Sequence, residues 1–129
     1  MKVVVVDSAR LGAEAEFPPL AADKFGWEQF PALDGEELAE RCWRAHVVVT
    51  VATPLDAQAM ERMTMLSLVV VAGEAAGHVD LDAARAAGVA VCHVPDADPA
   101  DPTKAQHICD EVVANIDAFM DGRKRHRLV

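Results

Sequence analysis

The sequence predicts an α/β protein with a flavodoxin-like, three-layer fold, in which helices cover both faces of a five-stranded parallel sheet. Short Val-rich runs do not alternate with polar residues, which is typical of strands buried on both faces. Amphipathic segments separate these runs, so each connection is long enough for a right-handed helical crossover. Strands connected in this way fit the order 2-1-3-4-5, with a switch point between the first and third strands.

Apolar runs predict most of the strands, and one strand is weaker. The apolar runs are Val3 to Val6, Val47 to Val51, Leu68 to Ala72 and Val89 to Val94. The weaker strand spans Gly26 to Ala32 and contains Trp27 and Phe30. Pro31 places it at an edge of the sheet, because proline cannot donate a hydrogen bond to a neighbouring strand.

The helices between the strands have recognisable ends. Asp34 to Ala45 begins with an aspartate and carries acidic residues in its first turn, as helix N-termini prefer. Asp56 to Met63 is a second, short helix. Asp80 to Ala87 is a third, and Gly88 is its expected C-cap. A further short helix is expected over Pro18 to Lys24.

The chain is expected to form one domain, residues 1–129, with four consecutive parts. These are a βα core (1–95), an Asp/Pro hinge (96–102), a long C-terminal helix (103–122) and a basic tail (123–129). Prolines in and beside the hinge exclude regular structure there. The helix presents Ile108, Val112 and Ile116 on one face and ends at Gly122. The tail is expected to be solvated.

Composition excludes several classes of partner. A net charge of −9 repels a polyphosphate backbone, so we expect no nucleic-acid partner. Apolar runs are too short for a membrane span, so no membrane partner is expected. Cys42, Cys92 and Cys109 lack the spacing of a disulfide framework or a zinc site, which favours a reducing, cytoplasmic location and no bound metal.

Known nucleotide and phosphate motifs are missing. None of the seven glycines forms a GxG pair, and no Walker loop exists. The segment Asp7 to Gly12 offers one hydroxyl to a flavin phosphate, and the loops that follow the strands hold no Trp or Tyr to stack on a flavin ring. A phosphoacceptor magnesium site would need an acidic pair beside Asp7, which is also missing.

One loop stands out as a candidate ligand site. Residues Gly73 to Val79 follow a buried strand and precede a helix, at the edge where open parallel sheets bind ligands. Exposed backbone amides in such a loop can hold a carboxylate, and the loop also contains His78. The alternative is that Gly73 and Gly77 only permit a tight turn.

Four segments carry a resemblance to a known family: Thr53 to Asp56, the strand Leu68 to Ala72, the loop Gly73 to Val79 and Asp80 to Pro95. They resemble the substrate-binding lobe of the D-isomer-specific 2-hydroxyacid dehydrogenases, and the run from Val79 to Pro95 is the specific part. The resemblance implies that the backbone of Gly73, Glu74 and Ala75 faces the carboxylate of a small 2-oxo or 2-hydroxy acid. It also implies that Thr53 and Pro54 lie beside the cleft.

The C-terminal part resembles two separate pieces of the same family. Ala105-Gln106-His107 is similar to the crossing into the family's nucleotide-binding lobe, and Val113 to Gly122 resembles its last helix. Family members carry the nucleotide-binding lobe between these pieces, with its GxGxxG turn and its catalytic Arg, Glu and His. None of these is present in the sequence, and His107 lies on the crossing helix, so we expect no catalytic residue here.

The leading interpretation is therefore an isolated or truncated substrate-binding domain that is not catalytically competent alone. Hydride transfer needs a positioned nicotinamide, so we expect no cofactor in this chain, although the family uses NAD or NADP. The alternative is a small-carboxylate binding or regulatory module, and a third interpretation is a subunit that complements a separate nucleotide-binding chain. Loss of a lobe exposes apolar surface, so we also expect a homodimer, swapped through the C-terminal helix.

Overall fold

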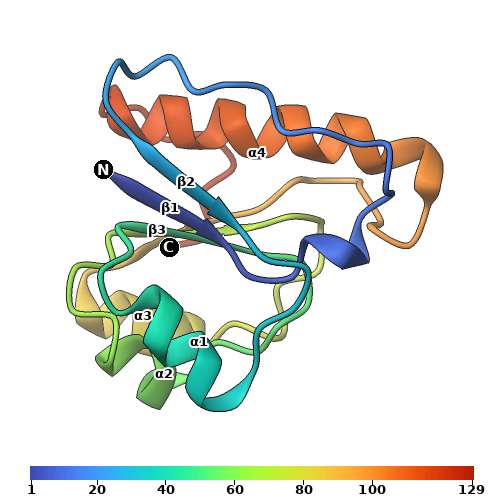
Figure 1. The fold of residues 1–129 in the computed structure, drawn as a ribbon. Helices are drawn as coiled ribbons and strands as arrows, with labels where there is room; N and C mark the ends of the chain where they lie inside the picture. The colour runs from blue at the N-terminus through green and yellow to red at the C-terminus, as the bar shows by residue number, and fades with distance from the viewer.

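The computed structural model describes residues 1–129 and has three layers (Figure 1). The central layer is a parallel sheet with the order β2-β1-β3-β4-β5, which confirms the predicted fold class and strand order. The strands are β1 (Lys2–Val5), β2 (Gly26–Gln29), β3 (Val47–Thr50), β4 (Leu68–Val71) and β5 (Ala90–Cys92). The helices are α1 (Gly35–Cys42), α2 (Ala57–Glu61), α3 (Leu81–Ala87) and α4 (Ala105–Met120), with short 3-10 helices η1 (Ser8–Arg10) and η2 (Pro102–Lys104).

The sheet separates two apolar cores. Val3 and Val5 of β1 pack on the side covered by α4, whereas Val4 and Val6 pack on the side covered by α1, α2 and α3. Figure 1 shows the same division, with α4 alone on one face of the sheet. Because both faces are buried there, β1, β3, β4 and β5 consist mainly of apolar residues, whereas the edge strand β2 is partly exposed and contains Glu28 and Gln29.

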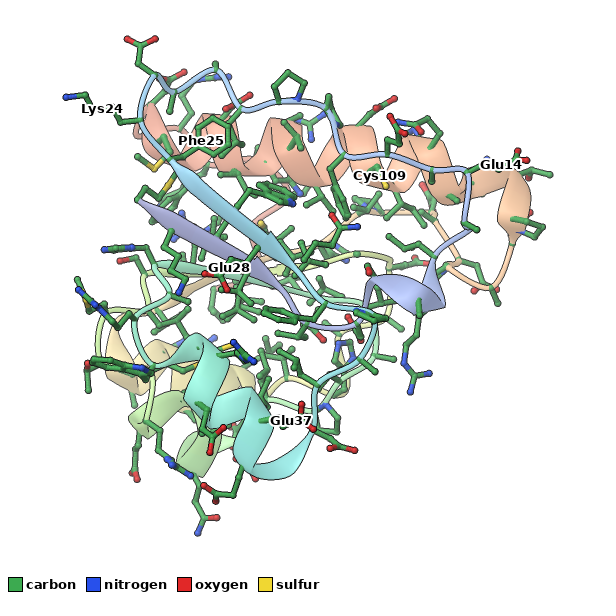
Figure 2. All side chains as sticks on the ribbon, in the orientation of Figure 1. Glu14, Lys24, Phe25, Glu28, Glu37 and Cys109 are labelled. Atoms are coloured by element: carbon green, nitrogen blue, oxygen red, sulfur yellow. The ribbon has the colours of Figure 1, made fainter.

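Side chains divide according to these layers. Cys109 of α4 points into the core and is 1% exposed, whereas Glu14, Lys24 and Glu37 extend away from it (Figure 2). All three cysteine thiols are free and buried. Burial raises the pKa of Cys92 to about 12 and that of Cys109 to about 11, so these thiols are not nucleophiles at neutral pH.

Helix ends follow local rules. The side chains of Asp56 and Asp80 accept hydrogen bonds from the amides of Ala59 and Ala83, at 2.8 and 2.9 Å, and so cap α2 and α3. Gly88 ends α3 with a φ of +73°, as predicted. Helices α1 and α2 are shorter than their predicted ranges. None of the helices combines the length and the hydropathy that crossing a membrane requires.

The prediction of a helix over Pro18 to Lys24 is wrong. This segment contains no helix and runs beside α4 (Figure 1). Leu20 is buried, and the amide of Ala21 donates to Oδ1 of Asp117 at 3.0 Å. Consecutive prolines disfavour a helix start here, because each proline restricts the residue before it to extended backbone.

The Asp/Pro segment is irregular up to Asp101, while Pro102 begins η2, and the segment is packed against the body of the protein. Residues 93–101 belong to no helix or strand. Ala97 is fully buried, and its carbonyl accepts a hydrogen bond from the amide of Glu74 at 2.9 Å. The segment therefore covers part of the loop that follows β4.

The tail is solvated only in part, since Arg123, Lys124 and His126 are exposed, whereas Arg125, Arg127, Leu128 and Val129 are half-buried. Arg127 forms an antiparallel bridge with Cys92, and the amide of Leu128 donates to the carbonyl of Val91 at 2.7 Å. The Arg125 guanidinium pairs with Glu111 of α4 and donates to Asn115 Oδ1. Unpaired backbone groups at the edge of β5 and an acidic side chain on α4 thus fix a basic segment that looks polar in sequence.

Candidate functional site

The carboxyl edge of the sheet contains the topological switch point. Strands β1 and β3 are neighbours, but the chain leaves β1 toward β2 and leaves β3 toward β4. Loops on either side of such a point diverge and create a crevice, which is where open α/β sheets bind ligands. The segments that follow β1, β3 and β4 meet at this edge.

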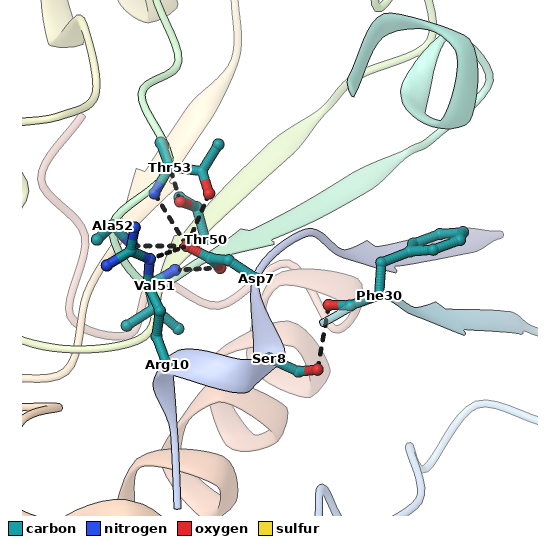
Figure 3. Close-up of polar contacts among 8 residues, drawn as sticks. All are labelled: Asp7, Ser8, Arg10, Phe30, Thr50, Val51, Ala52 and Thr53. Atoms are coloured by element: carbon teal, nitrogen blue, oxygen red, sulfur yellow. Dashed lines mark hydrogen bonds and ion pairs between the residues drawn. The ribbon is translucent and has the colours of Figure 1, made fainter. Parts of the chain in front are cut away.

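Asp7 joins two of these segments. Its carboxylate is 1% exposed, and Oδ1 accepts a hydrogen bond from the amide of Val51 at 2.8 Å. Oδ2 accepts from the amides of Ala52 and Thr53, at 2.8 and 2.9 Å, and from Thr53 Oγ1 at 2.8 Å (Figure 3). These donors offset the cost of burying a charge, so the turn after β3 is folded around the Asp7 side chain.

Arg10 lies beside this carboxylate. Its Nε is 3.8 Å from Oδ2 of Asp7, and its side chain is 61% exposed. Figure 3 shows the guanidinium extending from η1 toward the turn after β3. The backbone of η1 is held by β2, because Ser8 donates its amide and its hydroxyl to the Phe30 carbonyl, at 3.0 and 3.1 Å.

The loop that follows β4 lies on the other side of the turn. The Leu55 amide donates to the carbonyl of His78 at 2.9 Å, and the Asp80 amide donates to the carbonyl of Leu55 at 2.9 Å. Leu55 also forms a parallel bridge with Val79. The segment after β3 therefore holds the Gly73–Val79 loop in place.

Backbone amides in this loop are free. The amides of Gly73, Ala75, Ala76, Gly77 and His78 donate to no acceptor in the protein, whereas the amide of Glu74 donates to Ala97. Free backbone amides that follow one another in a loop at the edge of a sheet are donors of the kind that can hold an anion.

His78 is half-buried in the same loop. Its Nε2 is buried without a hydrogen-bond partner. Burial lowers the pKa of His78, and the nearby Asp7 carboxylate opposes that shift. The imidazole is therefore neutral at pH 7.

The predicted site residues differ in what they can offer a ligand. Thr53 is buried and donates both its amide and its hydroxyl to Asp7. Pro54 is exposed and lines a cleft of about 310 Å³ between α1 and α2. Gly73 is buried, the Glu74 amide is occupied, and Ala75 is exposed with a free amide. The structure thus brings Thr53 and the Gly73–Ala75 backbone to one edge, while Pro54 faces the helices.

Asp7 and Arg10 are the residues that sequence reasoning missed, because their loop was considered only as a flavin phosphate loop and as part of a phosphoacceptor magnesium site. The available signal was an aspartate directly after a buried strand at the predicted switch point. No group of His, Cys, Asp and Glu side chains is arranged to hold a metal ion.

The fold and its switch point are those of an open α/β domain, and comparison with known families identifies the class of protein. The family described as D-isomer specific 2-hydroxyacid dehydrogenase, catalytic domain, matches residues 3–129. The chain belongs to this family. No curated protein matches the chain.

Several solved structures with the same fold are dehydrogenases. They include NAD+-bound 3-phosphoglycerate dehydrogenase from Entamoeba histolytica, with 18% identity over 74% of this chain and 33% of that chain, at a TM-score of 0.57. NAD-dependent formate dehydrogenase from Staphylococcus aureus has 19% identity over 73% of this chain and 31% of that chain, at a TM-score of 0.52. D-lactate dehydrogenase from Escherichia coli has 20% identity over 77% of this chain and 32% of that chain, at a TM-score of 0.57. The chain therefore spans about a third of the length of these enzymes.

The expectation of no cofactor needs correction. The phosphoglycerate dehydrogenase structure contains NAD+, and the formate dehydrogenase is NAD-dependent and was solved with NAD. Solved proteins that share this fold therefore include ones that bind or depend on NAD.

Proposed function

We propose that this chain is the substrate-binding domain of a D-2-hydroxyacid dehydrogenase that uses NAD or NADP, and that it holds a small 2-oxo or 2-hydroxy acid at the carboxyl edge of the sheet. One observation carries the proposal. In a domain of this family, the loop after β4 presents free backbone amides beside the switch point.

The free amides suit a carboxylate. A carboxylate oxygen accepts several hydrogen bonds, and backbone donors that are already in place need no rearrangement to bind it. The loop offers the amides of Ala75, Ala76 and Gly77 in sequence, and its two ends are fixed by hydrogen bonds to Ala97 and Leu55. The task of these residues is to bind and orient the acid.

The nicotinamide would be held by a second lobe. Within this chain the loop after β1 has a single glycine, Gly12, and a Cβ added there would lie 3.2 Å from Cβ of Ala105. That loop has neither the repeated glycines nor the space of a dinucleotide-binding turn. When bound, the nicotinamide accepts or donates the hydride.

Binding is tested by titrating the chain with oxalate or pyruvate and following the backbone amide signals by NMR. We expect the largest shifts in residues 73–79. Pyruvamide keeps the 2-oxo group without the charged carboxylate, so it serves as the matched control and should not shift these signals. Equal shifts with pyruvate and pyruvamide, or no shifts in the loop, would contradict a carboxylate site.

Catalysis is tested with NADH or NADPH and glyoxylate, hydroxypyruvate or pyruvate. We expect no turnover by the chain alone, because none of its residues positions a nicotinamide. Turnover above background would contradict this part of the proposal. The alternative, a regulatory carboxylate-binding module, predicts binding without any complementing lobe. A complementing subunit predicts turnover when a separate nucleotide-binding chain is added.

Assembly and location complete the proposal. Free, buried cysteines are compatible with a reducing cytoplasm. The exposed large apolar side chains that favour a homodimer are Phe25, Trp43, Met65 and Met120. They lie near the amino ends of the strands, so a dimer can form through this surface. A second route is an exchange in which α4 of each protomer packs on the sheet of the other protomer. A sedimentation mass of one protomer at high concentration would contradict both routes.

A further inference from the structure

Arg10 differs from the other arginines in its surroundings. Seven of the eight arginines in the sequence pair with a carboxylate by hydrogen bond or lie over an aromatic ring, namely Arg41, Arg44, Arg62, Arg85, Arg123, Arg125 and Arg127. Arg10 makes no side-chain hydrogen bond, and its ionic contact with Asp7 is long, at 3.8 Å through Nε. Its terminal nitrogens are free donors.

Asp7 is too occupied to bind Arg10 more closely. Both carboxylate oxygens already accept hydrogen bonds from the Val51–Thr53 turn, three of them on the oxygen nearer to Arg10. The negative charge still attracts the guanidinium, so Asp7 keeps it above the turn (Figure 3). The planar guanidinium of Arg10 is thus oriented by Asp7, but its nitrogens donate no hydrogen bond.

The backbone beneath Arg10 is rigidly placed. Besides the bonds from Ser8 to Phe30, the Ala9 amide donates to the carbonyl of Pro31 at 3.1 Å, and the Arg10 amide donates to the carbonyl of Asp7 at 3.1 Å. Leu11, the next residue, is buried. A fixed backbone lowers the entropy that the side chain loses when it binds a ligand.

The surroundings make a cation necessary at this edge. Glu74, Asp96 and Asp98 are exposed in the loops after β4 and β5, and the whole protein carries a net charge of −9. A small anion that approaches free backbone amides in this field is repelled unless a local positive charge compensates. Arg10 is the residue at the switch point that can supply it.

We propose that Arg10 binds the carboxylate of the small acid, together with the loop amides. The guanidinium supplies the charge and two parallel donors to the carboxylate, and the free amides of residues 75–77, at the same edge of the sheet, supply further donors. This inference rests on the proposed function and names the residue of the chain that selects an anionic substrate.

The test compares oxalate affinity in three variants. Arg10→Gln should weaken binding roughly 10- to 100-fold, the range expected for loss of a hydrogen-bonded ion pair. Arg10→Lys keeps the charge but loses the two parallel donors of the guanidinium, so its oxalate affinity should lie between those of Arg10→Gln and the parent protein. Arg85→Gln removes the same charge from an exposed position on α3, where the side chain is 66% exposed, and should bind like the parent protein.

The outcomes separate this inference from the proposed function. Loop amide shifts with unchanged affinity in Arg10→Gln would overturn the role of Arg10 and leave the loop site standing. Shifts confined to residues 7–12 would contradict the loop site and with it a carboxylate held jointly by Arg10 and the loop amides. A loss of affinity of equal size in Arg85→Gln would show a general charge effect and overturn the inference. Absence of any oxalate binding would overturn both proposals.

Stability is measured on the same variants. Because the Arg10 side chain is exposed and makes no hydrogen bond, Arg10→Gln should unfold at the same denaturant concentration as Arg85→Gln. A lower affinity without a lower stability assigns the effect to binding.

Discussion

Asp7 and Thr53 are joined by two hydrogen bonds, since the amide and the hydroxyl of Thr53 both donate to Oδ2 of Asp7, at 2.9 and 2.8 Å. The residues are 46 positions apart in sequence and lie beyond the ends of two neighbouring strands. A side chain from β1 thereby sets the path of the chain after β3. That path in turn supports the loop after β4 through Leu55.

Replacing Asp7 by Asn tests this arrangement. The amide group of Asn has one acceptor oxygen, so its NH2 group must face backbone donors that Asp7 accepts from. We expect a loss of about 1–3 kcal/mol in the free energy of unfolding, measured by urea denaturation. Asp82→Asn, on the exposed surface of α3, is the matched control and should leave the midpoint unchanged. Similar midpoints for the two variants would show that the Asp7 carboxylate does not hold the turn.

Gly73 should not accept a side chain. Its φ is +157°, and a Cβ there would lie 2.9 Å from Cδ of Pro99. We expect Gly73→Ala to lower the free energy of unfolding by about 1–3 kcal/mol, through backbone strain and overpacking. At Gly77 an added Cβ meets nothing within 4 Å, so Gly77→Ala is the control. If Pro99 is the obstacle, Pro99→Ala should recover part of the loss in Gly73→Ala.

Stability should fall on acidification because of His78. The folded protein holds the pKa of this imidazole below its ordinary value of 6.5, mainly by burial, so the unfolded chain binds the proton more readily. The free energy of unfolding therefore decreases as the pH falls below about 6.5, and His78 contributes no slope above that value. We expect the free energy of unfolding of His78→Gln to depend less steeply on pH between 7.5 and 5 than that of the parent protein. Parallel curves for the two proteins would contradict this role.

Arg125 should hold the C-terminal segment against β5. It pairs with Glu111 and donates to Asn115 Oδ1, while Asn115 Nδ2 donates to the carbonyl of His93 at 2.9 Å. We expect Arg125→Gln to cost about 1 kcal/mol and to speed amide exchange at Val91 and His93. Arg123→Gln breaks only an exposed pair and should leave exchange at both amides unchanged. Equal exchange rates in the two variants would contradict the role of Arg125.

Local signals explain which elements could be predicted from the sequence. A buried strand of a parallel sheet is apolar on both faces, so Val47 to Val51 is recognisable without its neighbours. Asp80 and Gly88 mark the ends of α3 through bonds and dihedral angles within a few residues. The strand order then follows from alternation and crossover handedness.

Other features depend on distant contacts. Pro18 to Lys24 is irregular and packs along α4, and Asp117 is 96 positions from its partner Ala21. The partners of Asp7 are 44 to 46 positions away, so an isolated aspartate in the sequence gives no sign that four donors surround it. Site residues were therefore predicted through family resemblance, which indicates a loop but not which of its amides are free.

The pairing of Arg127 and Leu128 with β5 also affects whether another copy of the chain can add a strand to the sheet. A bare strand at the margin of a sheet is a template on which another chain can add a strand, the usual beginning of fibril growth. Here the protein's own last residues occupy that template, with Leu128 and Val129 bonded to Val91. The same few residues that look dispensable in sequence thus act as a guard against ordered aggregation.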